Sequence, residues 1–195
     1  MARLVARPLF WVATVAVLAA VPLGSGLLRR PPPPPPILGT LPPFQLTAPG
    51  GERLDREALA GRVWLLGFAD QGCVPCVEQL GSAMERLQYR LRNVGQAAGL
   101  LTVAVPGRAE VVDLTGEAAR HHANPRQWRV AGGPGALPLL AAVRALRPDR
   151  AAMPDAGAAV ALVDTHGRVR AVEGIERRED SDRLLAQLTL LLNLR

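Results

Sequence analysis

The apolar and polar positions of this 195-residue chain follow two periods, and together they predict an ordered series of strands and helices. Continuous apolar runs at 62–69, 100–105 and 159–164 are typical of strands buried on both faces of a sheet. Between the first two runs, the segment 74–94 repeats apolar residues every three or four positions, from Leu80 to Leu91. That spacing predicts an amphipathic helix directly after the first buried strand.

Shorter patterns predict the remaining elements. They are a strand at 44–48, one or two helical turns at 55–60, helices at 110–122 and 139–146, a turn at 164–167, a returning strand at 169–174 and a closing helix that includes 184–192. The core series is therefore strand, helix, strand, helix, strand, strand, helix, with one additional strand at its N-terminal side. This order predicts an α/β, thioredoxin-like fold, in which helices flank a central mixed sheet.

The N-terminal segment has a different pattern. Residues 8–28 contain no charged side chain, and about twenty apolar residues are enough to span a bilayer. We expect a retained signal anchor, a transmembrane helix within residues 1–30, with a cleaved signal peptide as the alternative. The prolines from Pro31 to Pro36 predict a stiff polyproline II linker over 31–39, followed by the domain at 40–195. The expected location is the cell inner membrane, crossed once, with the domain facing the periplasm.

Charge changes this picture little. The formal net charge is +6, and a positive net charge is typical of proteins that bind nucleic acids. However, four arginines flank the N-terminal apolar segment, and from residue 37 onward 19 arginines accompany 17 acidic residues. Those arginines are scattered rather than gathered into a stripe, so we do not expect a nucleic-acid partner.

The only two cysteines, Cys73 and Cys76, lie where the strand at 62–69 meets the helix that starts at 74. Free amide groups and the dipole at a helix N-terminus favour a thiolate on the first cysteine. The second cysteine, about one turn later, can resolve a mixed disulfide. Pro75 is compatible with the first helical turn, where its missing N–H has no partner to lose. We therefore expect Cys73 to be the exposed attacking thiol and Cys76 the more buried resolving thiol.

Three other roles for this cysteine pair compete with redox chemistry: zinc binding, a structural disulfide and Cu(I) binding. Zinc normally takes four Cys or His ligands, and the chain adds only His121, His122 and His166. A structural disulfide over so short a loop would constrain the unfolded chain little. Cu(I) binding stays open, because thiolates are soft ligands.

Several residues near these candidates have simpler expected roles. His166 is interpreted as a turn residue, and His121 and His122 as polar residues at a helix C-terminus. We expect Trp128 to pack in the core. Asp70 would oppose a thiolate on Cys73 if it lay close, but it is expected to be solvated.

From about residue 42 to 194 the chain resembles the SCO/SenC family of the thioredoxin superfamily. The resemblance rests on FQLTAPGGERLDREALAGRVWLLGFADQGC, MERLQYRL, NPRQWRVAGG and ALVDTHGRVRAVEG, in that order and spacing. It implies a role in cytochrome c oxidase assembly, by delivering copper or by reducing the cysteines of a copper-receiving subunit. The implied partner is a protein thiol or disulfide, such as an oxidase subunit.

Two departures from that family bear on copper. Only two residues separate Cys73 from Cys76, whereas the family usually has three. Copper-binding members also carry a histidine about eight residues before the aspartate of the late strand, and counting back from Asp164 reaches Ala156. The favoured hypothesis is therefore a membrane-anchored, SCO-like thiol–disulfide oxidoreductase. The alternatives are a non-enzymatic Cu(I) metallochaperone with Cys73 and Cys76 as metal ligands, and a binding module that has lost its chemistry.

Overall fold

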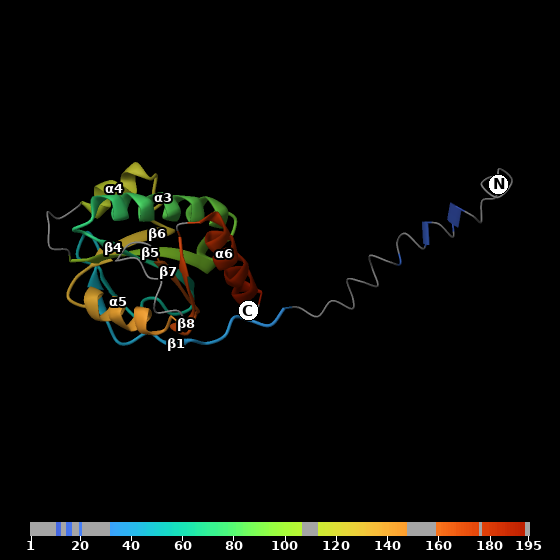
Figure 1. Ribbon diagram of the computed structural model, residues 1–195, viewed down its shortest axis with the longest axis horizontal. Coiled ribbons are helices and arrows are strands. Elements are labelled where there is room, and N and C mark those ends of the chain that lie inside the picture. Colours follow the sequence, from blue (N-terminus) through green and yellow to red (C-terminus); the bar gives the residue numbers. More distant parts are fainter. Residues whose placement is uncertain are drawn as a thin grey trace. The chain divides into compact units, whose positions relative to one another are not determined.

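An eight-stranded mixed sheet lies at the centre of the computed structural model of the protein (Figure 1). The structure describes residues 11–12, 15–16, 20, 32–106, 113–147, 159–175 and 177–193. The strands are β1 (Gly39–Thr40), β2 (Gln45–Thr47), β3 (Arg53–Asp55), β4 (Val63–Asp70), β5 (Ala98–Val105), β6 (Trp128–Gly132), β7 (Ala159–Val163) and β8 (Arg168–Gly174). Within the described part of Pro34–Arg195, the α-helices are α3 (Val74–Leu91), α4 (Leu114–Arg120), α5 (Ala136–Ala145) and α6 (Arg178–Leu192), and Gly95–Ala97 forms a short 3₁₀ helix.

The sheet order is β1-β8-β7-β4-β5-β6-β2-β3, so β4 and β5 are its innermost strands. The strands β4, β5 and β6 are parallel to one another, whereas β7 pairs antiparallel with β4. All but the last residue of β4 are buried, as the continuous apolar run at 62–69 predicted. The predicted α/β, thioredoxin-like arrangement of a mixed sheet and helices is confirmed.

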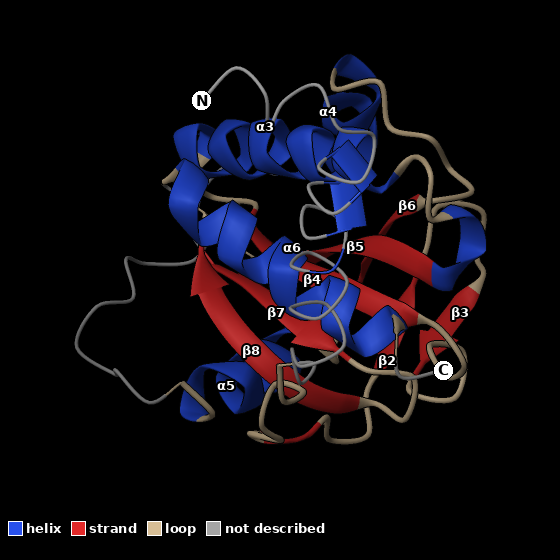
Figure 2. Ribbon diagram, turned by 90° about the vertical axis from the view of Figure 1, so that its right-hand side faces the viewer, coloured by secondary structure: helices blue, strands red, loops and turns tan. Residues whose placement is uncertain are grey.

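Helices cover both faces of the sheet. Figure 1 shows α3 and α4 over one face and α5 under the other, and α6 lies next to α3 in Figures 1 and 2. The two faces hold separate cores, because successive β4 side chains point to opposite sides. Trp64, Leu66 and Phe68 pack on the α5 side, whereas Val63 and Leu65 pack on the α3 and α6 side.

Two short segments differ from the sequence-based expectation. Residues 55–60 do not form helical turns: Arg53–Asp55 is the strand β3, and hydrogen-bonded turns follow it, with the Asp55 carboxylate accepting from the amide of Ala58 at 2.8 Å. The sequence patterns predicted no strand around Trp128, but this segment forms the strand β6 beside β5. Both strands are short: β3 pairs with the preceding strand β2 in a hairpin, and β6 pairs with β5, 28 positions earlier in the chain.

The N-terminal part of the chain is described only in pieces. Chain contacts separate the unit Met1–Pro33 from the unit Pro34–Arg195. Most of the expected signal anchor lies outside the described residues, and among those that are described we find no helix of the length and hydrophobicity needed to span a bilayer. The domain boundaries at 30/31 and 39/40 therefore stay predictions.

The last prolines of the linker contact the domain. Pro35 is buried, and its carbonyl accepts a hydrogen bond from Nη1 of Arg170 at 2.8 Å. The amide of Leu38 donates to Val169 O at 2.9 Å, and Gly39 then pairs with the same residue in β8. The end of the proline run is thereby fixed to the edge of the sheet.

Candidate active site at the Cys73–Cys76 disulfide

A tight turn joins the end of β4 to the start of α3. The Asp70 carboxylate accepts a hydrogen bond from the Gly72 amide at 2.9 Å, and the Asp70 carbonyl accepts from the Cys73 amide at 3.0 Å. The Gln71 amide donates to Val105 O at 3.0 Å, which extends the parallel pairing of β4 and β5 beyond the last strand residue. The polypeptide therefore enters the helix within three residues, as the strand-to-helix junction in the sequence predicted.

Cys73 is the N-cap residue of the 18-residue helix α3, and no side chain caps this helix end. Pro75 lies in the first turn, so the amides of Val74 and Cys76 are the first-turn donors. No acidic residue occupies that turn. The positive end of the helix dipole is thus uncompensated by acidic side chains within its first turn, and it stabilises negative charge on the Cys73 sulfur.

Cys73 and Cys76 form a disulfide, with their Cα atoms 5.2 Å apart. Both residues are half-buried, so burial does not distinguish the attacking from the resolving cysteine. Between them, Val74 is 63% exposed and Pro75 is exposed as well. A protein thiol can therefore approach the disulfide over a small apolar surface.

The helix that holds the disulfide is fixed closely against the sheet. A methyl group at Gly67 in β4 would lie 2.7 Å from Cδ1 of Leu80 and 2.9 Å from Cε of Met84. The absence of a side chain at Gly67 allows α3 to pack at this distance. Leu80, Met84 and Leu87 are almost completely buried, as the helical periodicity predicted.

Asp70 is half-buried rather than fully solvated. One of its carboxylate oxygens is engaged by the Gly72 amide, so Asp70 shapes the turn that precedes Cys73. Trp128 is buried, as expected, and its indole donates to the Thr102 hydroxyl at 2.9 Å.

The three histidines do not gather at the disulfide. His166 is exposed in the turn between β7 and β8, beyond the end of β7 that pairs with the start of β4. His122 is exposed just after α4. His121 lies between two carboxylates, with Nδ1 3.1 Å from Oε2 of Glu85 and Nε2 3.2 Å from Oε1 of Glu117.

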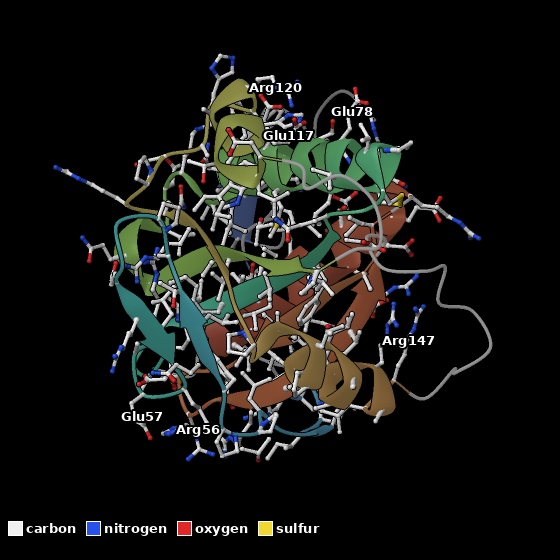
Figure 3. All side chains as sticks on the ribbon, turned by 90° about the vertical axis from the view of Figure 1, so that its left-hand side faces the viewer. Arg56, Glu57, Glu78, Glu117, Arg120 and Arg147 are labelled. Carbon is white, nitrogen blue, oxygen red and sulfur yellow. A yellow bond between two sulfur atoms is a disulfide. The ribbon has the colours of Figure 1, made fainter. Side chains whose placement is uncertain are left out.

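Glu117 is a buried acidic residue that the sequence analysis did not single out. It is 8% exposed and also pairs with Arg120, next to which it lies in Figure 3. A methyl group at Gly81 in α3 would collide with the His121 ring, which shows how closely α4 covers this helix. The spacing of Glu117, Arg120 and His121 on one helical face was the available sequence signal. The contact of His121 with Glu85 could not be predicted in this way, because the two residues are 36 positions apart.

The residues that could hold a copper ion are Cys73 and Cys76, through their sulfurs, once the disulfide between them is reduced. Within the described ranges, no group of three or more Cys, His, Asp or Glu side chains is arranged to hold a metal ion. Ala156, the position where the resembling family has a histidine, lies outside the described residues. Among the described residues, no His, Asp or Glu side chain is therefore grouped with the two sulfurs as a third ligand.

No family model and no curated protein matches the sequence, whereas many solved structures match the fold. BsSco, a member of the Sco family of cytochrome c oxidase assembly proteins with a disulfide switch, is similar with a TM-score of 0.62 and 17% identity, over 83% of this chain and 97% of its own. A SCO1/SenC family lipoprotein from Bacillus anthracis str. Ames has a TM-score of 0.59 and 19% identity, over 80% of this chain and 96% of its own. The thioredoxin domain of a thiol-disulfide oxidoreductase from Bacteroides vulgatus has a TM-score of 0.52 and 14% identity, over 78% of this chain and 97% of its own. The protein thus has a thioredoxin-like fold with a Cys73–Cys76 pair, and its structural neighbours include Sco/SenC family proteins.

Proposed function

We propose that this protein is a membrane-anchored, Sco-like thiol–disulfide oxidoreductase that acts outside the cytoplasm, in the assembly of cytochrome c oxidase or its copper site. The observation that carries this proposal is the Cys73–Cys76 disulfide at the uncapped N-terminus of α3. A half-buried disulfide beside an exposed Val74 is accessible to another protein, and the helix end stabilises the thiolate that exchange requires.

The reaction is a two-step exchange. A thiolate of the partner attacks the Cys73 sulfur, the Cys73–Cys76 bond breaks, and Cys76 leaves as a thiolate that takes up a proton. The second partner thiolate then attacks the partner sulfur of the mixed disulfide and releases Cys73. The partner dithiol is oxidised to a disulfide, and the Cys73–Cys76 disulfide is reduced to two thiols. Run in reverse, the same steps reduce a partner disulfide, with Cys73 attacking and Cys76 resolving.

Location and pathway are supported by different observations. The uncharged segment 8–28 is long enough for a membrane anchor. Structural similarity to a cytochrome c oxidase assembly protein supports the proposed pathway. The partner is then a protein dithiol or disulfide, such as an oxidase subunit.

Exchange with small thiols tests the reaction. The oxidised full chain is incubated in dithiothreitol buffers of graded potential, and the two cysteines are trapped with an alkylating reagent and counted by mass spectrometry. Because the chain has no other cysteine, the alkyl count reports this disulfide alone. We expect a reversible two-electron transition. When the Cys76→Ser variant is treated with oxidised glutathione instead, we expect a stable glutathione mixed disulfide on Cys73, with one reduced glutathione released. A disulfide that never exchanges would contradict the proposal.

The same two sulfurs support a second candidate, a Cu(I) metallochaperone. Two thiolates on one helical turn suit a soft monovalent ion, although a third ligand would have to come from the partner or from undescribed residues. Competition titration of the reduced chain with Cu(I) tests this candidate. Affinity no higher than that of an unstructured peptide with the same two cysteines would reject it, without affecting the exchange assay.

A further inference from the structure

A surface groove between α3 and α6 has no part in the exchange reaction described above. Its volume is about 760 Å³, and it is lined by the C-terminal half of α3, by the loop that follows α4 and by the first turns of α6. A second, shallower hollow is lined by Pro75, Glu78, Gln79, Ser82, Arg86 and Ile175. Arg86 lines both hollows, so together they form one track along α3 that begins beside the disulfide.

The far part of this track carries unpaired positive charge. Four arginines and two acids line the larger groove, and both acids have partners: Glu85 contacts His121 at 3.1 Å, and Asp182 pairs with Arg90 at 3.2 Å. Arg86 and Arg178 are exposed, and neither has an ion-pair partner among the described residues. Arg92 stacks on the Tyr89 ring. Near the disulfide the charged side chain that lines the track is negative instead, because Glu78 is the charged residue closest to Pro75 along the helix.

The larger groove also offers apolar surface. Tyr89 is 65% exposed, and Leu185 is half-buried on the α6 side.

Resting on the proposed exchange function, we propose that this α3–α6 track binds an extended, acidic segment of the protein whose cysteines react with Cys73–Cys76. The segment leaves the reacting cysteines, passes Glu78 with neutral residues and places carboxylates against Arg86 and Arg178. From Pro75 to Arg86 the helix rises about 16 Å, which an extended chain covers in about five residues. The acidic residues of the partner are therefore expected about five positions from its cysteine pair.

Three reduced peptides test the inference on the oxidised full chain. The first has two cysteines, a neutral five-residue spacer, then three acidic residues and a leucine. The second has glutamine in place of the acids, and the third has the acids directly after the cysteines. Reduction of the Cys73–Cys76 disulfide is followed by alkylation and mass spectrometry. We expect a KM about tenfold lower for the first peptide than for the second, with a similar kcat, and loss of that difference at 1 M salt.

Charge reversal gives the matched variants. Arg86→Glu with Arg178→Glu removes the preference for the first peptide. The control, Arg53→Glu with Arg56→Glu, changes the net charge equally, and Arg56 lies on the opposite side of the molecule from Glu78 (Figure 3). This control variant should keep the preference for the first peptide over the second. Both double variants should react with dithiothreitol at the wild-type rate, and a far-UV circular dichroism spectrum equal to that of wild type shows that they are folded.

The outcomes separate the two proposals. Three results would each overturn the acidic-segment proposal while dithiothreitol still reduces the protein. They are equal KM values for the first two peptides, a KM for the third peptide as low as for the first, and loss of the preference for the first peptide in the control variant. Failure of dithiothreitol itself would overturn the exchange function instead.

Discussion

Replacing Asp164 by asparagine tests how the turn between β7 and β8 is held in place. Asp164 is 4% exposed. Its Oδ1 accepts from the amides of His166 at 2.9 Å and Arg168 at 3.0 Å, and its Oδ2 accepts from Nε of Arg168 at 2.8 Å and Nε of Arg170 at 2.7 Å. Asparagine keeps Oδ1 and its two backbone bonds. It replaces Oδ2 by an NH₂ group that faces two guanidinium donors.

The expected loss of stability follows from the two hydrogen bonds to Oδ2 that the variant cannot form. Hydrogen bonds to charged groups contribute about 1.5–3 kcal/mol each, and the variant loses two of them. Arg170 is well buried but the Arg168 side chain is 35% exposed, so water compensates part of its loss. We expect the free energy of unfolding to fall by about 3 kcal/mol. Because Arg170 also donates to the carbonyl of Pro35, hydrogen exchange at the amide of Leu38 should become faster.

Urea unfolding at pH 7, followed by the fluorescence of the buried Trp64 and Trp128, measures this change. Asp113→Asn is the matched control: Asp113 is an exposed N-cap that accepts from the Thr115 amide at 3.0 Å, and asparagine caps helices about equally well. It should change the stability by less than about 0.5 kcal/mol. A loss below about 1 kcal/mol in the Asp164 variant would refute the reasoning from these bonds.

The stability difference between wild type and Asp164→Asn depends on pH with a definite sign. Burial by itself raises the pKa of Asp164, but the hydrogen bonds from Arg168, Arg170 and His166 outweigh it and hold this pKa below its ordinary value. A carboxylate whose pKa is lower in the folded than in the unfolded state stabilises the fold above the unfolded pKa, about 3.9. The stability difference between wild type and Asp164→Asn should therefore be constant from pH 7 to about 5 and shrink as the pH falls below about 4.

Three further predictions concern other parts of the fold. A methyl group at Gly135 would lie 2.6 Å from the backbone oxygen of Gln45, so Gly135→Ala should destabilise the domain by about 2 kcal/mol in urea unfolding; an unchanged midpoint would contradict this packing. Trp128→Phe should cost about 2 kcal/mol through a lost indole hydrogen bond and a cavity, and a stability equal to that of wild type would argue against both. In the reduced chain at pH 7, Cys73 should be alkylated roughly tenfold faster than Cys76, as peptide mass mapping can measure, and equal rates would remove the assigned roles.

Local patterns in the sequence were sufficient for the main strands and for the candidate site. The apolar run at 62–69 became β4, the helical spacing after Cys73 became α3, and the Cys-x-x-Cys pair lies at their junction. These features depend on neighbours in the chain, because burial on both faces, helical period and capping are each visible within about twenty residues.

Tertiary structure decided what depends on distant partners. The strand β6 is recognised through its pairing with β5, since a segment of five residues has too little pattern of its own. His121 contacts Glu85 across 36 positions, and the Arg170 side chain contacts the carbonyl of Pro35 across 135 positions. The groove between α3 and α6 likewise exists only once α6 packs beside α3. The sequence by itself determined the element types and the reactive pair, whereas the long-range contacts that surround the pair required the folded chain, because periodicity specifies which face is buried and not what covers it.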